Sequence, residues 1–217
     1  MGRKQNRRKA AQRGVVTQPE PTPQQADTAG QYRWAWAEMA ISSLIGLIAS
    51  LVLSIEAVVL AENAGAELAC NLSERISCGS VALSWQASLL GFPNAFLGLI
   101  AEPIVLTVAV AGLGGVRFPR WFMLTAQGIY TIGLAFAWWL FAQSYLVIGK
   151  LCPWCLLITV TTTLVFTSMT RINLLEGNLG QKAKDKTEGL LAAKADVWGS
   201  ATIIMIGAFA VWYKYIL

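Results

Sequence analysis

Residues 121–171 read WFMLTAQGIYTIGLAFAWWLFAQSYLVIGKLCPWCLLITVTTTLVFTSMTR. Lys150 is the only charged side chain before Arg171, so the segments 121–149 and 151–170 are both uncharged. A helix needs about 20 consecutive apolar residues to cross the hydrocarbon core of a bilayer. The stretch therefore predicts two transmembrane helices joined by a short turn.

The composition of the whole chain agrees with a membrane protein. The chain has 217 residues, of which 55% are hydrophobic and 13% are charged, and its mean hydropathy is +0.53. Soluble domains carry about 25% charged residues. The net charge of +5 comes largely from basic residues in the N-terminal segment that ends at Arg33. Because no folded domain has a basic face, the sequence excludes a nucleic-acid binder.

Three further apolar stretches extend this pattern. We expect spans over residues 39–60, over residues 93–113 with Pro93 in the first turn and a break at Glu102-Pro103, and over residues 197–213. Together with spans over residues 121–148 and 152–170, they predict an all-α integral membrane protein. Its fold would be a four-helix transmembrane bundle with a fifth, C-terminal transmembrane helix.

The predicted domain organisation follows from the spans. Residues 1–35 form a basic cytoplasmic tail, expected to be disordered because positions 1–30 hold almost no bulky apolar side chains. Residues 36–172 form the core with an outer loop over residues 61–91, residues 173–196 a cytoplasmic linker, and residues 197–217 the fifth helix. We expect no cleaved signal peptide, because about 25 polar residues separate the basic residues from the first apolar run.

The distribution of basic residues predicts the orientation in the membrane. With a cytoplasmic N-terminus, 14 of the 17 Lys and Arg residues fall on the inner side, and only Arg75, Lys150 and Lys214 fall outside. Basic residues accumulate in cytoplasmic loops. The chain is therefore expected in the plasma membrane as a multi-pass protein, with residues 61–91 and the turn at residues 149–151 outside the cytoplasm.

All four cysteines then lie on the outer side, where disulfides form and persist. Cys70 and Cys78 lie in the outer loop, and Cys152-Pro153-Trp154-Cys155 begins the fourth span. A CxxC at a helix start is favoured as a reactive dithiol, because free backbone N–H groups stabilise a thiolate there. Two static disulfides or a zinc site formed by the four thiolates are the alternatives.

The sequence at this point resembles the vitamin K epoxide reductase family in its bacterial form, a DsbB-like group of disulfide-forming membrane oxidoreductases. The resemblance covers about residues 40–170. It rests on the motifs C-x7-C-G-S-V-A-L-S-W from Cys70, G-F-P-N-A-F-L-G at residues 91–98, and C-P-W-C from Cys152. It implies a four-helix bundle around a quinone.

The resemblance also implies roles for the cysteines. Cys152 and Cys155 correspond to the pair that faces the quinone, and Cys155 corresponds to the cysteine that contacts the quinone ring. Cys70 corresponds to the cysteine that exchanges with an outside partner, and Cys78 to the one that passes electrons to Cys152.

Further candidates surround the quinone in this resemblance. Asn94 corresponds to an Asn that hydrogen-bonds a quinone carbonyl, and Ser84 to a Ser or Thr near the relay. Thr159 stands where many members have Tyr, so the second carbonyl contact differs here. Trp154, with Trp85, is a candidate for the quinone mouth or for an aromatic belt. Residues 79–91 are expected along the interface as a lid.

The predicted function is that of a quinone-dependent thiol-disulfide oxidoreductase. It would re-oxidise an extracytoplasmic thioredoxin-fold (DsbA-like) partner and pass the electrons to menaquinone or ubiquinone, supporting disulfide formation in exported proteins. Because the chain ends at Leu217, a separate partner protein is expected. The alternatives are a reductase of vitamin K epoxide or quinone in its own right and a non-enzymatic membrane protein stapled by structural disulfides. Glu56 is expected to be solvated, and Glu102 to face the bundle interior or to lie near an interface.

Overall fold

The computed structural model describes residues 23–180, 182, 189 and 195–215, and this part of the chain consists of helices, their connecting loops and one isolated bridge between Ile76 and Leu151. The helices are α2 (Pro23–Glu62), α3 (Cys78–Ala82), η1 (Trp85–Ser88), α4 (Ala95–Leu113), α5 (Arg120–Gln143), η2 (Ser144–Ile148), α6 (Pro153–Leu175) and α8 (Ala195–Tyr215). Among the described residues, those up to Gln31 and those from Tyr32 onward belong to two compact units.

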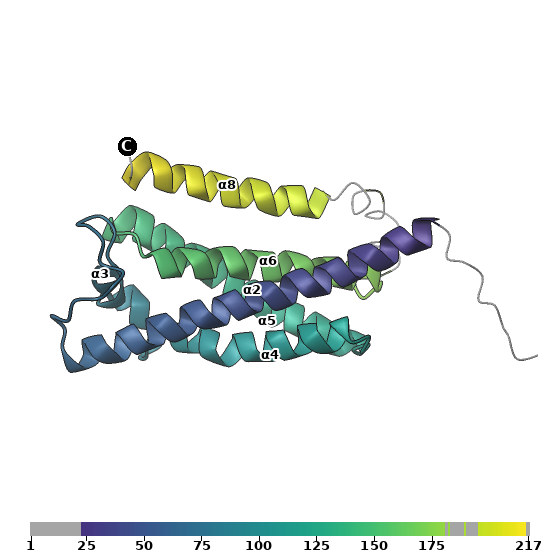
Figure 1. Ribbon diagram of the computed structural model, residues 1–217, viewed down its shortest axis with the longest axis horizontal. Coiled ribbons are helices and arrows are strands. Elements are labelled where there is room, and N and C mark those ends of the chain that lie inside the picture. The colour runs from purple at the N-terminus through teal and green to yellow at the C-terminus, as the bar shows by residue number, and fades with distance from the viewer. Residues whose placement is uncertain (1–22, 181, 183–188, 190–194, 216–217) are drawn as a thin grey trace, which may run out of the picture. The chain divides into compact units, whose positions relative to one another are not determined.

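Four helices are long and apolar enough to cross a membrane. They are Ala29–Glu62 of α2, Ala95–Leu113, Arg120–Ile148 and Pro153–Leu175. Consecutive helices run in opposite directions and form an elongated bundle, with α3 and the outer loop at one end (Figure 1). These are the four core spans predicted from the sequence. The fourth continues to Leu175, slightly beyond the predicted end at residue 170.

The first span begins earlier than predicted. Helix α2 starts at Pro23, so the prediction of disorder is wrong for residues 23–35, while residues 1–22 lie outside the described residues. Trp36 is 1% exposed, and its ring packs against Tyr32 and Phe118. Because Trp36 is buried against the bundle, the helix is packed in place around this residue, before the predicted start at residue 39.

The second span is continuous through Pro103, so the predicted break at Glu102-Pro103 is wrong. Proline within a membrane helix is tolerated where neighbouring groups satisfy the backbone. The Thr107 hydroxyl donates to the Pro103 carbonyl at 2.7 Å, a local bond one turn further along the helix that does not replace the backbone hydrogen bond lost at Pro103. Glu102 faces the bundle interior as expected, where it accepts a hydrogen bond from the Tyr130 hydroxyl at 3.0 Å and is 5% exposed.

The third span ends at the turn that leads into the CxxC. Helix α5 continues through the wider turns of η2 and stops at Gly149, which has a φ of 68°. This left-handed conformation favours glycine, because a side chain there would meet the backbone. The Ser144 hydroxyl donates to the Lys150 carbonyl at 2.5 Å and thereby secures the turn.

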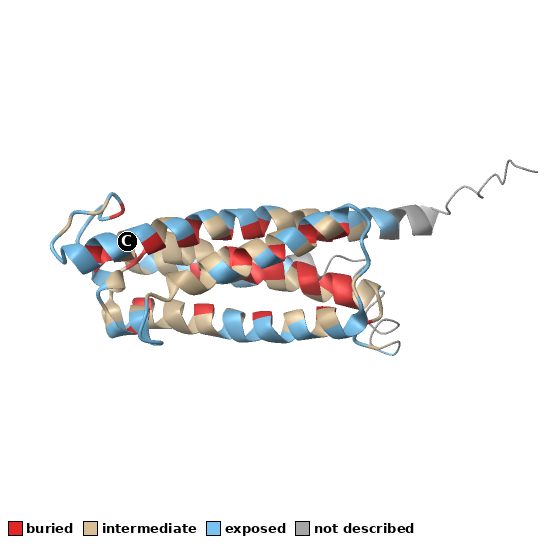
Figure 2. Ribbon diagram, turned by 90° about the horizontal axis from the view of Figure 1, so that it is seen from below, coloured by how far each residue is buried: buried red, intermediate tan, exposed pale blue. Residues whose placement is uncertain are grey.

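Helix α6 is the most buried of the four spans. Half of its most apolar window is buried, and the buried residues lie on the faces of the helices that point inward (Figure 2). The main hydrophobic core joins all four long helices through residues that include Trp36, Met39, Ala109, Met123 and Met169. This core fixes the register of the bundle and thereby the position of its ends.

Helix α8 is formed where the fifth span was predicted. It lies beside the bundle: the Lys214 ammonium group donates to the Tyr145 carbonyl, and the Tyr145 and Tyr215 rings meet edge to face at 6.1 Å. It is not among the four helices identified as apolar enough to cross a membrane. The fifth crossing therefore stays a prediction.

Candidate functional site

The four cysteines, predicted from the sequence to share one side of the membrane, come together at the end of the bundle that carries α3. Cys70 and Cys78 form a disulfide in the loop after α2. Cys152 and Cys155 are free and stand at the beginning of α6. Cys70, Cys78 and Cys152 form a small buried cluster against which Trp154 and Cys155 pack. Two pairs that are distant in the sequence thus meet in one site.

The closest contact between the two pairs is 3.5 Å, from Cys152 Sγ to Cys78 Sγ. Cys78 is fully buried and Cys152 is 2% exposed, whereas Cys70 is 7% exposed. A sulfur at this distance from a disulfide needs to move by about 1.5 Å to form a bond of about 2.05 Å. The arrangement can therefore exchange the Cys70–Cys78 disulfide for a Cys78–Cys152 bond with little rearrangement.

A short parallel bridge holds the loop against the CxxC. The backbone N–H of Ser77 donates to the Leu151 carbonyl at 3.0 Å, and the N–H of Leu151 donates to the Arg75 carbonyl at 2.9 Å. The Lys150 ammonium group donates to the Glu74 carbonyl. Because Ser77 precedes Cys78 and Leu151 precedes Cys152, the bridge places the two sulfurs beside each other.

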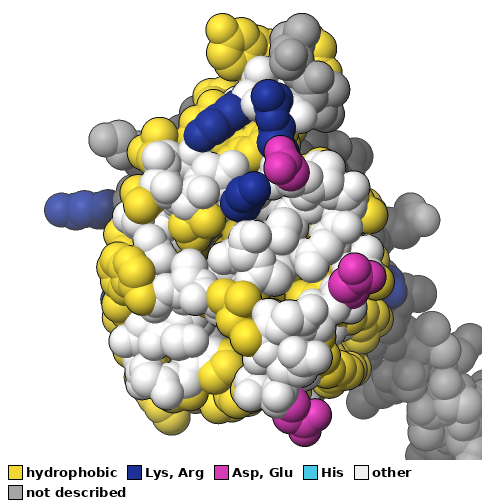
Figure 3. Space-filling view, turned by 90° about the vertical axis from the view of Figure 1, so that its left-hand side faces the viewer, with side chains coloured by type: hydrophobic (Ala, Val, Ile, Leu, Met, Phe, Trp, Pro, Cys, Tyr) yellow, Lys and Arg dark blue, Asp and Glu magenta, His cyan; other side chains and the backbone are white. Residues whose placement is uncertain are grey.

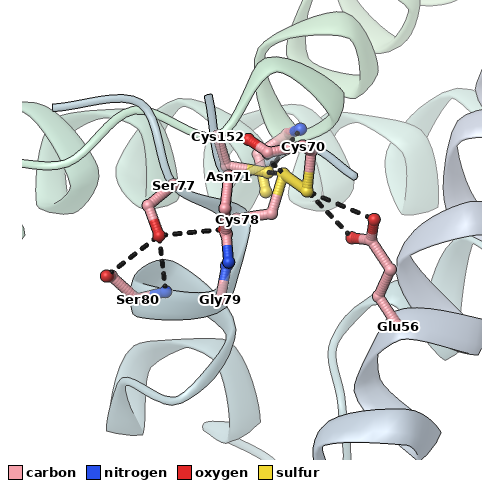
Figure 4. Close-up of a disulfide and its surroundings, with 9 residues drawn as sticks. Glu56, Cys70, Asn71, Ser77, Cys78, Gly79, Ser80 and Cys152 are labelled. Atoms are coloured by element: carbon pink, nitrogen blue, oxygen red, sulfur yellow. Dashed lines mark hydrogen bonds between the residues drawn. A yellow bond between two sulfur atoms is a disulfide. The ribbon is translucent and has the colours of Figure 1, made fainter. Parts of the chain in front are cut away.

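A side-chain network orients the short helix that begins at Cys78 (Figure 4). The Asn71 side-chain oxygen accepts from the backbone N–H of Gly79 at 3.1 Å and from the Ser77 hydroxyl at 3.0 Å. Ser77 caps the helix by accepting from the N–H of Ser80. Sequence analysis did not identify Asn71, because it lies in an irregular loop where no helix or strand periodicity marks a residue.

Cys152 caps the first turn of α6, just before the membrane span. Its sulfur accepts a hydrogen bond from the backbone N–H of Cys155 at 3.3 Å. A hydrogen bond from the Cys155 thiol lowers the pKa of Cys152, against the opposing effects of burial and of the Glu56 charge. The cap position thus favours a thiolate at Cys152, as the CxxC at a helix start predicts.

Glu56 is a site residue that sequence reasoning did not assign. Its two carboxyl oxygens lie 3.2 and 3.4 Å from Cys70 Sγ (Figure 4). The side chain is half-buried, so the expectation that it is simply solvated is wrong. Because a helix end and an irregular loop separate Glu56 from Cys70 along the chain, no sequence pattern could have predicted this contact.

The Glu56 carboxyl and the two loop sulfurs lie within 4.8 Å of one another, a spacing that suits metal ligands. The two sulfurs are bonded to each other. A disulfide has no thiolate to offer a metal ion, so a metal at this position would require the reduced pair.

Asn94, implied as a quinone ligand, immediately precedes α4. One of its amide N–H groups donates to the Gln86 carbonyl at 2.7 Å, and its side-chain oxygen is buried and accepts no hydrogen bond from the described residues. The second N–H group suits a quinone carbonyl, and the oxygen suits a quinol hydroxyl. The amide group therefore fits both forms of a quinone.

The hydroxyl groups of Thr159 and Ser84 both donate hydrogen bonds to nearby backbone carbonyls. The Thr159 hydroxyl donates to the Cys155 carbonyl at 3.0 Å, and the Ser84 hydroxyl donates to the Val81 carbonyl at 2.6 Å. Each hydroxyl keeps lone pairs that can accept a hydrogen bond but has no second proton to donate. Thr159 thus differs from a Tyr, which can extend a donor toward a quinone carbonyl.

The two candidate tryptophans have different environments. Trp154 is half-buried against the cysteine cluster. Trp85 is 64% exposed and meets Trp139 edge to face at 6.3 Å. Within residues 79–91, the segment that contains α3 and η1 exposes Leu83, Leu89 and Leu90. This exposed apolar surface agrees with a segment that lies along the membrane interface.

On the end face that carries the loop, the Lys and Arg side chains gather toward the top of the view, and the Asp and Glu side chains lie apart from one another (Figure 3). Most of the remaining face is uncharged.

Comparison with known proteins agrees with the arrangement of spans and cysteines. No curated protein matches the chain. A family model described as the vitamin K epoxide reductase family matches residues 37–170, which include both cysteine pairs and most of the four long helices. Members of this family are membrane oxidoreductases that act on disulfides and on quinones or similar compounds. With most of its length matched and two cysteine pairs meeting at one end of a four-helix bundle, the chain belongs to the vitamin K epoxide reductase family.

Proposed function

We propose that this oxidoreductase re-oxidises a separate thioredoxin-fold protein outside the cytoplasm and passes the electrons through its two cysteine pairs to a membrane quinone. The observation that carries the proposal is the distance of 3.5 Å between Cys78 Sγ of the loop disulfide and Cys152 Sγ of the CxxC. Two structural staples would have no need of such a contact. A relay requires it, because thiol exchange proceeds only through a mixed disulfide.

The outer half of the relay begins at Cys70. Of the two loop sulfurs, Cys70 belongs to the more exposed residue, whereas Cys78 is fully buried. A thiolate of the reduced partner attacks Cys70 Sγ, the Cys70–Cys78 bond breaks, and Cys78 leaves as a thiolate. The second thiolate of the partner then closes the partner's own disulfide and releases Cys70.

The inner half of the relay uses the contact between Cys78 and Cys152. The Cys78 thiolate attacks Cys152 of an oxidised CxxC, and Cys155 leaves as a thiolate. Cys70 then attacks Cys78, which restores the loop disulfide and leaves both electrons on Cys152 and Cys155. This final arrangement, with the loop pair bonded and the CxxC free, corresponds to the pairing in the structure.

The quinone is the terminal oxidant in this proposal. It takes up two electrons from the reduced CxxC, together with two protons that balance those lost when the partner's two thiols ionise, and becomes quinol. Cys155 stands in the first turn of α6, at the start of the span. Asn94 would orient the ring through its free N–H group, and Trp154 would cover the site against water.

The distribution of basic residues supports the orientation that this route needs. The end of α6 with Arg171 lies opposite to the cysteines, and 14 of 17 basic residues fall on that side in the proposed topology. The cysteines would then face an oxidising compartment, which suits disulfide formation in exported proteins. A reporter fused after Arg171 should therefore be found in the cytoplasm.

The proposal is tested by anaerobic quinone reduction with the purified protein and a reduced thioredoxin-fold donor. We expect quinol from the native chain and its loss in Cys70→Ala, Cys78→Ala, Cys152→Ala and Cys155→Ala. Leu72→Ala is the matched control, because Leu72 lies between the loop cysteines and is exposed. If the native chain forms no quinol while the CxxC stays oxidised, the relay is refuted.

A further inference from the structure

The contact between Glu56 and Cys70 has no role in the relay as described so far. Glu56 projects from the last turns of α2, which ends at Glu62, and both of its oxygens face the same sulfur at 3.2 and 3.4 Å (Figure 4). A carboxyl group placed in a membrane helix is costly and is kept where it has a partner or a task. The partner here is a redox-active sulfur.

A charged carboxylate cannot accept a hydrogen bond from a disulfide, because a bonded sulfur has no hydrogen to donate. A neutral carboxyl group can donate its O–H to the disulfide sulfur, and a carboxylate can accept from the S–H of a reduced Cys70. The contact is therefore favourable in both redox states when a single proton is shared between the oxygen and the sulfur.

Few groups near Glu56 other than cysteines could accept this proton. Within the described part of the chain, no Lys or Arg nitrogen forms an ion pair with Glu56, and its titratable neighbours are the cysteines of the two pairs. Cys70 in the loop is in contact, and Cys152 and Cys155 on α6 experience the Glu56 charge. A buried proton near Cys70 is thus exchanged with a thiol more readily than with a basic side chain.

We propose that Glu56 is the proton donor and acceptor for Cys70 during thiol exchange. The inference deepens the proposed function and rests on it. The Glu56 carboxyl protonates Cys70 when Cys70 is released from the partner, and the carboxylate takes the same proton back when Cys70 closes the loop disulfide. Glu56 is a catalytic residue in this scheme, because it touches the reacting sulfur.

The two steps balance in protons and electrons. On release, the partner's second thiolate attacks the partner sulfur bound to Cys70, the mixed disulfide breaks, and Cys70 leaves with the electron pair and takes the proton of Glu56. On closing, the Cys70 thiol returns that proton to Glu56 and attacks Cys78, the Cys70–Cys78 bond forms, and Cys152 leaves from Cys78 as a thiolate. Glu56 therefore ends the cycle as it began.

The scheme also gives the relay a direction. While Cys70 is held as a thiol by the Glu56 carboxylate, Cys78 is the loop sulfur free to be a thiolate. Cys78 is also the sulfur that faces Cys152. The proton on Cys70 thus disfavours the reverse attack of Cys70 on the partner's disulfide before Cys78 has attacked the CxxC.

The first measurement isolates the thiol. In a chain with Cys78→Ala, Cys152→Ala and Cys155→Ala, only Cys70 remains, and its reaction with a small aromatic disulfide is followed against pH. Adding Glu56→Gln keeps the shape of the side chain but removes its charge. We expect the pH midpoint to fall by about one unit, which gives roughly tenfold more thiolate at neutral pH and, because a thiolate of lower pKa is a weaker nucleophile, a reaction about three- to fourfold faster.

The second measurement follows turnover in the chain with all four cysteines. General acid–base catalysis contributes about 10² to 10⁴ in rate, so Glu56→Gln should slow quinol formation by about tenfold or more. Glu56→Asp should recover part of the rate, because it keeps the acid with a shorter reach. Glu62→Gln, at an exposed position at the end of the same helix, is the control and should leave the rate unchanged.

The proposal is supported if Glu56→Gln makes Cys70 react faster with the aromatic disulfide and also slows quinol formation. A merely structural role of Glu56 would not make Cys70 more reactive. An unchanged pH profile of Cys70 in the Glu56→Gln chain would overturn it, and so would undiminished turnover. If the native chain forms no quinol, the proposed function fails, but the pH profile of Cys70 still tests its contact with Glu56. Should Glu56→Gln lose the helical circular dichroism spectrum, the same comparison is made with Glu56→Asp.

Discussion

Replacing Asn71 by alanine should loosen the segment that holds Cys78 beside Cys152. Asn71 accepts from the backbone N–H of Gly79 and from the Ser77 hydroxyl. The hydroxyl can turn to Ser80 Oγ, which lies 3.0 Å away, so its bond is replaced. The N–H of buried Gly79 has no such substitute.

The cost of Asn71→Ala is therefore that of one part-buried hydrogen bond, about 0.5–1.5 kcal/mol. At about 1.4 kcal/mol per tenfold change, the arrangement with the sulfurs in contact should become about 2- to 12-fold less populated relative to displaced ones. Asn63→Ala is the matched control. Asn63 accepts from the N–H of Gly65 in an exposed part of the same loop, so water can replace this bond.

The assay uses a chain with Cys70→Ala and Cys155→Ala, in which only the sulfurs of Cys78 and Cys152 remain, 3.5 Å apart. Mild oxidation should form the Cys78–Cys152 disulfide rapidly, as measured by mass spectrometry of alkylated peptides. Asn71→Ala should slow its formation by the factor given above, and Asn63→Ala should leave it unchanged. Equal rates in all three chains would refute the idea that this network positions Cys78.

Two further predictions concern the helix crossing and the CxxC. Gly112→Ala should destabilise the protein by about 1–3 kcal/mol in thermal unfolding in detergent, because the new Cβ would lie 2.5 Å from the buried Trp36 ring. Gly128→Ala is the control and should be neutral or stabilising in the same experiment, because its new Cβ would meet nothing within 4 Å. In a chain without the loop cysteines, Cys155→Ala should raise the pKa of Cys152, because the hydrogen bond from the Cys155 thiol is the largest influence that lowers it. The midpoint of the alkylation rate of Cys152 against pH would then lie at a higher pH than in the chain that keeps Cys155. An unchanged midpoint would contradict this cause.

The sequence alone was enough to predict the features that depend on local chemistry. Uncharged runs located the four spans to within a few residues, except that the first helix begins well before its predicted start at residue 39. The placement of Cys152 before Pro153 predicted a cysteine at a helix start. These features could be predicted because lipid imposes a length and a polarity on each helix independently of its neighbours.

Features that depend on contacts between distant segments could not be predicted in this way. Trp36 lies before the predicted start of the first span, and its contact with Phe118 joins segments far apart in the sequence. The contact of Glu56 with Cys70 depends on the path of an irregular loop. None of these contacts leaves a period or a motif in the chain.

The two ends of the bundle are stabilised by different interactions, and this difference suits a relay of electrons between cysteine pairs. One end is held by the large hydrophobic core around Trp36 and Met169. At the other end the apolar cluster is small and consists mainly of the cysteines, so the loop is secured by hydrogen bonds of its backbone and of Asn71. Hydrogen-bonded loops with few apolar contacts open at lower free energy than packed helices. Cys70 and Cys78 can therefore change partners while α6 holds Cys152 in place.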